Sequence, residues 1–333
     1  MNIVGTLEDL ISINSVTGDE ESILNFIEDF LIKNNFNGEV VRNDGGIIAV
    51  PVDSSKKVAL VGHVDTVPVS DTQINTTDND DLIVGRGTVD MKGGVAVILH
   101  ALINEGKDIV GVFYTAEEGP YDKNGLGILM PILLSYSELE IAIIMEPTNN
   151  QIELGCLGAL NATLQINGTA AHSARPWVGK NPIYDISKVT EVVLKNEILD
   201  LDIEGLNYKQ VLSITKLSEG IAKSYGGKAI VEIDDGADIT YNDPEIMDRM
   251  LPSLKKSAGN ENVILSNAKT LAEDYAYYLN EIPGFLFELG GYNTNEEREA
   301  PAHHTPDFFI DDSSMLLGVK VMTNLALDFL KSE

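Results

Sequence analysis

The 333-residue sequence is poor in cysteine, in basic residues and in long apolar runs. Its single cysteine, Cys156, excludes an internal disulfide and suits a reducing compartment. Only 23 lysine and arginine residues stand against 52 acidic ones, giving a net charge of −29. This balance argues against a nucleic-acid partner, because phosphate binding needs a basic surface. No apolar run of transmembrane length is evident, and residues 1–5 lack the basic flank of a signal peptide, so we expect a cytoplasmic protein without membrane contact.

Histidine is also scarce, but three of the five histidines lie in short motifs that, with carboxylate motifs between them, are typical of a metal site. The motifs occupy residues 62–66, 87–94, 115–119, 145–148 and 302–305. Neutral imidazole and carboxylate oxygens are the usual non-thiolate ligands of zinc. A lone histidine or aspartate at a strand end is more often a turn or cap residue. Five such clusters in one chain favour the metal site.

Three of these motifs directly follow apolar, β-branched runs, at residues 58–61, 110–114 and 141–145. Such runs are typical of buried strands in a parallel sheet. The candidate ligands would then lie at the carboxyl ends of strands, where open α/β sheets place their sites.

The order of the motifs resembles the aminoacylase and succinyl-diaminopimelate desuccinylase family of di-zinc metallopeptidases. The first two thirds are most similar to the desuccinylase branch, including residues 155–158, 172–177 and 205–208. The resemblance implies an α/β fold: a mixed-sheet, zinc-exopeptidase-like catalytic domain with a small inserted α+β lid domain. It assigns residues 1–159 and 240–333 to the catalytic domain and 160–239 to the lid.

The same resemblance implies a ligand set for two Zn²⁺ ions, with Co²⁺ or Mn²⁺ as substitutes. His63 and Glu146 would bind one zinc, Glu118 and His304 would bind the other, and Asp90 would bridge both. His304 is favoured over His303 as the ligand, because it aligns with the histidine that precedes Ser/Thr-Pro in a related branch.

Catalytic roles also come from the resemblance. Glu117 would be the general base, and Asp65 would orient His63. The Asp90–Met91 bond would be cis. His172 resembles the family histidine that reaches the scissile carbonyl from a partner subunit, although a surface histidine in a turn is the alternative.

After residues 217–220 the sequence departs from the desuccinylase pattern. Residues 217–233 and the later segments 272–279 and 300–306 resemble a second branch, the amidohydrolases related to hippurate hydrolase. The chain therefore resembles a splice of two relatives, joined near residues 217–223, with a shortened lid. A natural deletion, a recombinant and a designed chimera are all compatible with this pattern.

The spacing of apolar residues predicts further elements. We expect helices at 7–11, 20–34, 93–104 and 182–194, a hairpin at 40–50, and lid strands at 161–168, 210–215 and 228–233. Thr17 or Asp19 is placed to cap the second helix. His100 lies at a core-like position of the third helix and is expected to be structural.

Three functions remain open. The favoured one is zinc-dependent hydrolysis of N-acyl amino acids, as in N-succinyl-LL-2,6-diaminopimelate desuccinylase of lysine biosynthesis. The alternatives are a dipeptidase or carboxypeptidase and a zinc-binding scaffold with little activity. The shortened lid predicts either a homodimer paired through exposed edges at 210–215 or 228–233, or a monomer in which His172 lies too far from the zinc ions.

Overall fold

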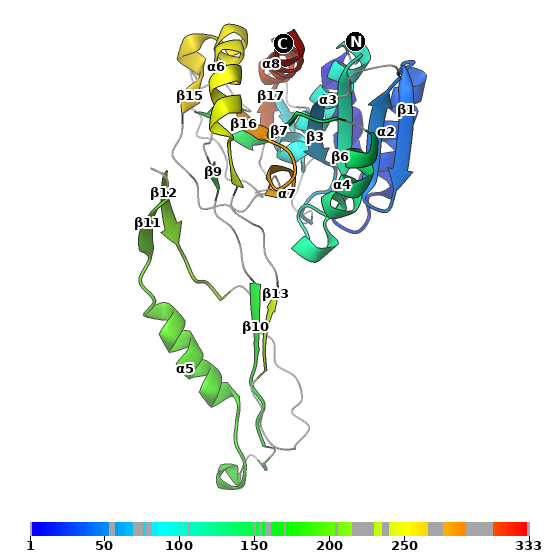
Figure 1. The fold of residues 1–333 in the computed structure, drawn as a ribbon. Helices are drawn as coiled ribbons and strands as arrows, with labels where there is room; N and C mark the ends of the chain where they lie inside the picture. Colours follow the sequence, from blue (N-terminus) through cyan, green and yellow to red (C-terminus); the bar gives the residue numbers. More distant parts are fainter. Residues whose placement is uncertain are drawn as a thin grey trace.

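An α/β body carries a narrow arm that extends away from it (Figure 1). Both ends of the chain lie in the body. The computed structural model describes residues 2–52, 57–68, 76–77, 82–105, 107–136, 138–148, 151–152, 155–156, 161–169, 171–172, 174–203, 206–214, 230–234, 240–265, 276–290 and 309–331.

The body is built on a six-stranded sheet with the strand order β1-β2-β6-β3-β7-β16. Four of its strands run parallel, and the other two form an antiparallel hairpin at one edge. The sheet is therefore mixed, as expected. Its strands are β1 (Gly38–Asn43), β2 (Gly46–Pro51), β3 (Val58–His63), β6 (Ile109–Tyr114), β7 (Ile141–Thr148) and β16 (Gly284–Gly290).

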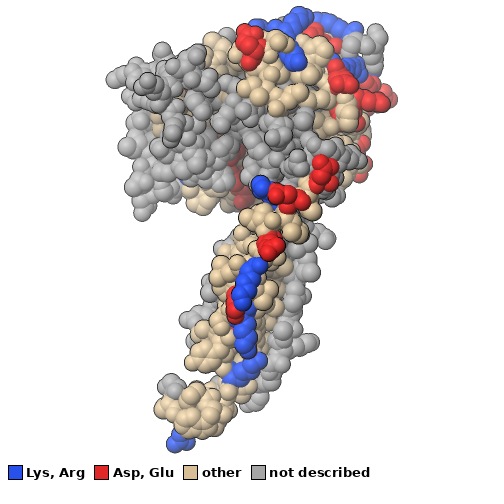
Figure 2. Space-filling view, turned by 90° about the vertical axis from the view of Figure 1, so that its left-hand side faces the viewer, with Lys and Arg blue, Asp and Glu red and all other residues tan. Residues whose placement is uncertain are grey.

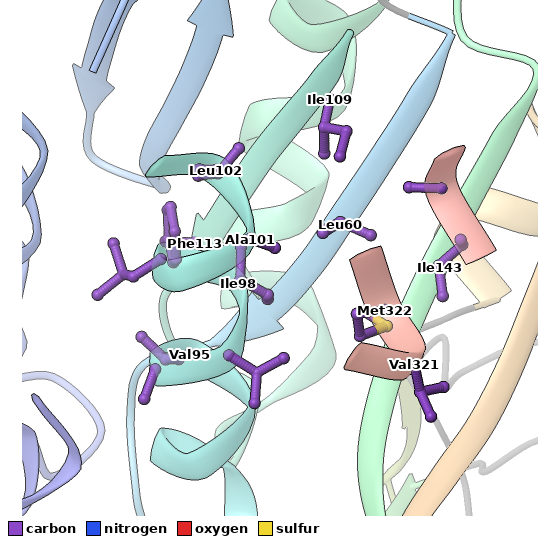
Figure 3. Close-up of a cluster of buried hydrophobic side chains, with 14 of the residues drawn as sticks. Leu60, Val95, Ile98, Ala101, Leu102, Ile109, Phe113, Ile143, Val321 and Met322 are labelled. Carbon is purple, nitrogen blue, oxygen red and sulfur yellow. The ribbon is translucent and has the colours of Figure 1, made fainter. Parts of the chain in front are cut away.

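Both faces of this sheet are covered by helices, which explains why β3 and β6 are buried at every position. Alternate residues of β3 enter different cores: Leu60 packs into the cluster that includes α3 and α8, and Val61 into the cluster that includes α4. Figure 3 shows Leu60 and Ile143 on the sheet facing Ile98 and Met322 on the helices.

Helices α1, α2, α3, α6 and α8 contribute to the first cluster, and α4 and α7 to the second. Their bounds are α1 (Ile3–Ser12), α2 (Glu21–Lys33), α3 (Gly93–Glu105), α4 (Gly125–Tyr136), α6 (Pro244–Ala258), α7 (Ala276–Leu279) and α8 (Asp312–Lys331). The helices predicted at 7–11, 20–34 and 93–104 are confirmed. His100 is buried in α3, where its Nε2 lies 2.9 Å from the Thr6 hydroxyl, as its structural assignment requires.

Helix α8 corrects the expectation that no segment is long and apolar enough to cross a membrane. Residues 313–331 pass that test by length and composition alone, with a mean hydropathy of 1.2. However, 44% of that window is buried in the protein, and Met322 and Phe329 lie in the first core cluster. We therefore attribute the apolar composition of α8 to its packing in the core.

The arm comprises elements between residues 161 and 234 that do not join the six-stranded sheet. Strand β10 (Asn161–Gln165) pairs antiparallel with β13 (Ile230–Asp234), and helix α5 (Ile183–Leu194) follows β10 in the chain. These elements confirm the predicted first and last lid strands and the lid helix. The domain boundaries themselves stay a prediction.

The strand predicted at residues 210–215 is wrong. A hairpin of β11 (Leu199–Ile203) and β12 (Leu206–Gln210) precedes it, and residues 211–214 form no strand. Residues 199–203 alternate leucine or isoleucine with aspartate, which is also a strand pattern. The segment 206–210 pairs with them, so that only Gln210 of the predicted strand lies in the ladder.

Short elements complete the described structure. Three small sheets pair β4 (Thr76–Thr77) and β17 (Phe309–Asp311) with β5 (Leu82–Val84), β9 (Gly155–Cys156) with β14 (Thr240–Tyr241), and β8 (Gln151–Ile152) with β15 (Ile264–Leu265). Helical turns occur at η1 (Thr88–Lys92), η2 (Tyr121–Lys123), η3 (Pro176–Val178) and η4 (Asn260–Asn262). The Cys156 side chain and the predicted join near 217–223 lie outside the described residues.

The predicted side-chain cap of α2 is also wrong. The cap position is Glu20, with no side-chain hydrogen bond to the helix. Thr17 is used elsewhere, because its hydroxyl donates to Asp65 at 2.8 Å.

Candidate metal centre

Three of the candidate motifs lie where neighbouring parallel strands end. His63 is the last residue of β3 and is paired in register with Tyr114, the last residue of β6. Glu117 and Glu118 follow β6 after two residues, and Glu146 lies near the end of β7. This confirms the expectation that these three motifs follow strands and lie at the carboxyl edge of the sheet, the usual place for a site in this architecture.

His63 is held between two aspartates. Its ring is buried, with 1% of the side chain exposed, and Nδ1 lies 3.1 Å from the Asp65 carbonyl and 3.5 Å from its Oδ1. The other ring nitrogen, Nε2, lies 3.0 Å from Asp90 Oδ1. A proton on Nδ1 that faces Asp65 orients the ring so that Nε2 points to Asp90. This is the orientation that a histidine ligand of zinc requires.

Asp65 connects the two strand ends. Its fully buried carboxylate accepts hydrogen bonds from the backbone N–H of Glu117 to Oδ1 at 3.0 Å and from that of Glu118 to Oδ2 at 3.1 Å. Burial by itself would raise the pKa of Asp65, but the hydrogen bonds from His63, Thr17 and Glu117 outweigh it and hold that pKa below its usual range. The residue therefore stays charged, faces the His63 ring and fixes the backbone of Glu117 and Glu118.

The loop that carries the two glutamates turns sharply after β6. Ala116 has a positive φ of 58°, a conformation that few residues other than glycine adopt. Thr115 N–H donates to Gly45 and its carbonyl accepts from Gly125, which anchors the start of the loop. Because this turn follows directly on the buried strand, the backbone amides of both glutamates face Asp65.

Asp90 lies in η1, at the start of α3, and its bond to Met91 is cis, as expected. Gly93 begins the helix, where an added Cβ would lie 2.6 Å from the Thr88 carbonyl oxygen. Glycine is therefore needed at position 93 because the backbone of Thr88 lies close to it.

Lys92 is buried and donates through Nζ to the carbonyls of Leu10 and Ile13 at the end of α1. Burial lowers the pKa of Lys92 to about 8.

His172 is the one described candidate that the structure leaves apart from the others. It belongs to the segment between β10 and α5, which lies at the far end of the arm from the six-stranded sheet (Figure 1). Its Nδ1 accepts the Ala174 N–H at 3.0 Å within an exposed turn. A role at the centre of the same chain is not supported by this position.

The ligand set is incomplete among the described residues, and no group of three or more metal-binding side chains occurs within them. The Glu146 backbone pairs with Glu288 of β16, but its side chain lies outside the described part of the structure, as do His303 and His304. The described pair of His63 and Asp90 nevertheless fits a zinc ion, since a buried imidazole and a carboxylate converge at a strand end.

Two residues at the centre were not found by the sequence reasoning. The sequence favours Thr17 or Asp19 as a helix cap and gives Lys92 no role beyond its place in the motif at 87–94. A threonine hydroxyl and a lysine amine can form hydrogen bonds with many nearby groups, so the residue type alone does not indicate the partner. Their contacts with Asp65 and with the end of α1 depend on residues 48 and about 80 positions away in the chain.

Structural comparison finds the same fold in solved structures of low sequence identity. A metallo-carboxypeptidase of the M20 family from Sulfolobus solfataricus superposes with a TM-score of 0.72 at 14% identity, over 99% of this chain and 100% of that one. A tripeptidase from Staphylococcus aureus gives 0.69 at 18% identity, over 97% and 96%. The Bacillus subtilis YXEP protein, described as a dinuclear metal-binding peptidase, gives 0.65 at 16% identity, over 99% and 98%.

The chain belongs to peptidase family M20/M25/M40, which it matches over residues 59–328. The DapE protein of Mycobacterium tuberculosis, provisionally named a succinyl-diaminopimelate desuccinylase, is 35% identical over 237 residues, 70% of this chain and 65% of that protein. The succinyl-diaminopimelate desuccinylase of Corynebacterium glutamicum is 35% identical over 223 residues, 65% of this chain and 60% of that protein. The chain thus spans less than two thirds of the length of these relatives.

Proposed function

We propose that this protein is a zinc-dependent hydrolase of N-acyl amino acids, with N-succinyl-LL-2,6-diaminopimelate or a close analogue as substrate. The observation that carries the proposal is Asp65, whose carbonyl and carboxylate both face His63 Nδ1 and whose buried carboxylate accepts the backbone N–H groups of Glu117 and Glu118. The names of the two desuccinylase relatives support the choice of acyl group.

Two Zn²⁺ ions, when bound, would supply Lewis-acid activation of a water molecule and of the amide carbonyl. In the proposed ligand set His63 and Glu146 would hold one ion, Glu118 and His304 would hold the other, and Asp90 would contribute to both sites. Co²⁺ and Mn²⁺ share enough of this ligand preference to serve as substitutes.

The chain itself moves the proton. Glu117 accepts it from the attacking water and delivers it to the leaving amine, so that a carboxylate and a free amino acid are formed. The amides of Glu117 and Glu118 are fixed by Asp65, so that the base and the neighbouring ligand are held in one geometry. His172 stabilises the oxyanion from a second copy of the chain.

A homodimer through the arm would supply this histidine. The arm exposes Trp177, Tyr184, Val192 and Leu194 at 68–80% of their surfaces, and α5 has no buried residue. Exposed apolar side chains on one element favour association. Figure 2 shows both basic and acidic side chains along the arm. Ion pairs in this part of the chain join Lys195 to Glu191 and Lys209 to Asp200. We assign the enzyme to the cytoplasm, with a small-molecule substrate and neither nucleic acid nor membrane as a partner.

Peptidase activity is the second candidate, because proteins of the same fold include a tripeptidase and a carboxypeptidase. Zinc analysis together with hydrolysis of succinyl-, acetyl- and dipeptide substrates separates the candidates. We expect two zinc ions per chain and the highest kcat/KM on the succinyl substrate. Preference for dipeptides would favour the peptidase, and zinc binding without turnover would favour an inactive scaffold.

Asp90→Ala tests the bridging role in the same assay. We expect both zinc ions to bind more weakly, since each loses a ligand. Loss of only one equivalent, with full activity retained, would contradict the bridge.

A further inference from the structure

The connection between α1 and α2, residues 13–20, lies directly against the candidate centre. We call it the strap. The Thr66 N–H donates to the Ser15 carbonyl at 3.0 Å, and the Thr17 N–H donates to the Thr66 carbonyl at 3.2 Å. The Ser15 hydroxyl adds a bond to the Val64 carbonyl at 2.9 Å. The strap therefore runs alongside the segment that follows His63 and contains Asp65.

A tight turn fixes the position of Thr17 within the strap. The Asp19 N–H donates to the Val16 carbonyl at 2.7 Å, and Gly18 has a φ of 92°, in the left-handed region. This pattern is that of a turn with glycine at its third position, where other residues are strained. Glu20 accepts the Gly18 N–H at 2.9 Å and holds the turn from its other side.

Both branches of the Thr17 side chain face the centre. Its hydroxyl donates to Asp65 Oδ2 at 2.8 Å, and this same oxygen accepts the backbone N–H of Glu118. Its methyl carbon lies 3.0 Å from the position that a Cβ on Gly119 would occupy. Thr17 therefore contacts the Asp65 carboxylate and also approaches the backbone next to Glu118.

We propose that Thr17 is a positioning residue for the metal centre, acting through Asp65 on the backbone that carries Glu117 and Glu118. A buried carboxylate that loses one donor becomes under-satisfied. Asp65 would then rotate toward other donors, and the two amides bound to it would follow. This inference rests on the proposed function only in taking Glu118 as a metal ligand.

Thr17→Val removes the hydroxyl and retains the shape, whereas Thr17→Ser retains the hydroxyl. Ser15→Ala is the matched control, since it removes a hydroxyl of the same strap that bonds to Val64 instead of Asp65. Each protein is stripped with a chelator and titrated with Zn²⁺ alone in competition with a chromophoric chelator. We expect affinity for one zinc ion to fall about tenfold in Thr17→Val, at the low end for outer-sphere partners.

In the same experiment Thr17→Ser and Ser15→Ala should bind zinc like the wild type, and the melting temperature of Thr17→Val should fall no further than that of Ser15→Ala. With the succinyl substrate, kcat of Thr17→Val should fall while KM changes little. In an Asp65→Ala background, Thr17→Val should have no further effect on zinc binding. If Thr17→Val does not fold, Thr17→Ala removes the same hydroxyl without adding a buried methyl group.

Wild-type zinc affinity in Thr17→Val would overturn the inference, and so would an equal loss in Ser15→Ala or an undiminished effect in the Asp65→Ala background. Zinc binding by the wild type without hydrolysis would overturn the proposed function alone, because the zinc titration still tests Thr17. A wild-type chain that binds no Zn²⁺ would overturn both.

Discussion

The body and the arm use apolar side chains in opposite ways. In the body, all six residues of β3 are buried, and helices cover the sheet on both faces. In the arm, none of the twelve residues of α5 is buried, and Leu194 is 80% exposed. The described candidate ligands and the candidate base, Glu117, lie in the body, and His172 lies in the arm. Under the proposed function, the arm of a second copy would have to bring His172 to the centre in the body.

The largest expected effect lies in the body. Glu117→Gln should lower kcat by on the order of 10²–10⁴, because the amide cannot accept the proton of the attacking water. Zinc stoichiometry should stay unchanged in that variant. Glu118→Gln serves as the comparison and should weaken zinc binding. Equal zinc loss in both variants would contradict the division into base and ligand.

A leucine-to-alanine substitution should lower the free energy of unfolding much more in the body than in the arm. Leu60→Ala removes a fully buried side chain of β3 and should lower the free energy of unfolding by about 2–5 kcal/mol. Leu194→Ala on α5, exposed in the single chain, should change the free energy of unfolding of the monomer by no more than about 0.5 kcal/mol. Urea denaturation at one protein concentration measures both, and similar losses would show that the arm is packed as tightly as the body.

Mixing two inactive variants tests whether the arm serves the body of another chain. Glu117→Gln and His172→Ala each lack one catalytic group, but a mixed dimer contains one site with both. With free subunit exchange, about a quarter of all sites should be complete, by the symmetry of a two-fold dimer. Activity is measured after mixing and compared with each variant alone. A monomeric mass together with no recovery would contradict the trans role of His172.

The smallest effect concerns acid stability. Burial lowers the pKa of His100 from its ordinary value of 6.5. As pH falls through 6.5 the unfolded chain binds a proton before the folded one does, so the free energy of unfolding decreases down to the folded pKa. His100→Gln should flatten this part of the pH profile, and His172→Gln on the exposed turn is the control. An unchanged slope in His100→Gln would mean that His100 is protonated equally in both states.

The sequence alone was sufficient to predict those elements that depend on a short run of neighbouring residues. The runs at 58–61, 110–114 and 141–145 predicted parallel strands, because residues covered on both faces must be apolar throughout. The same runs predicted where His63, Glu117 and Glu146 would lie, because parallel strands end at a common edge. The order of the motifs was also sufficient to indicate the family.

Only the tertiary structure decided how the centre is held together. Thr17 has the residue type and the position of a helix cap, yet its hydroxyl donates a hydrogen bond to Asp65, 48 residues away in the chain. Asp65 was expected to orient His63. Its hydrogen bonds to the backbone N–H groups of Glu117 and Glu118 link the segment after β3 to the loop after β6, and no spacing in the sequence predicts this link. In the arm, residues 210–215 fit a strand pattern, yet β11 pairs with residues 206–210, and residues 211–214 form no strand. A residue type limits which bonds a side chain can make, but the partner it finds depends on which distant segments the fold brings within 3 Å.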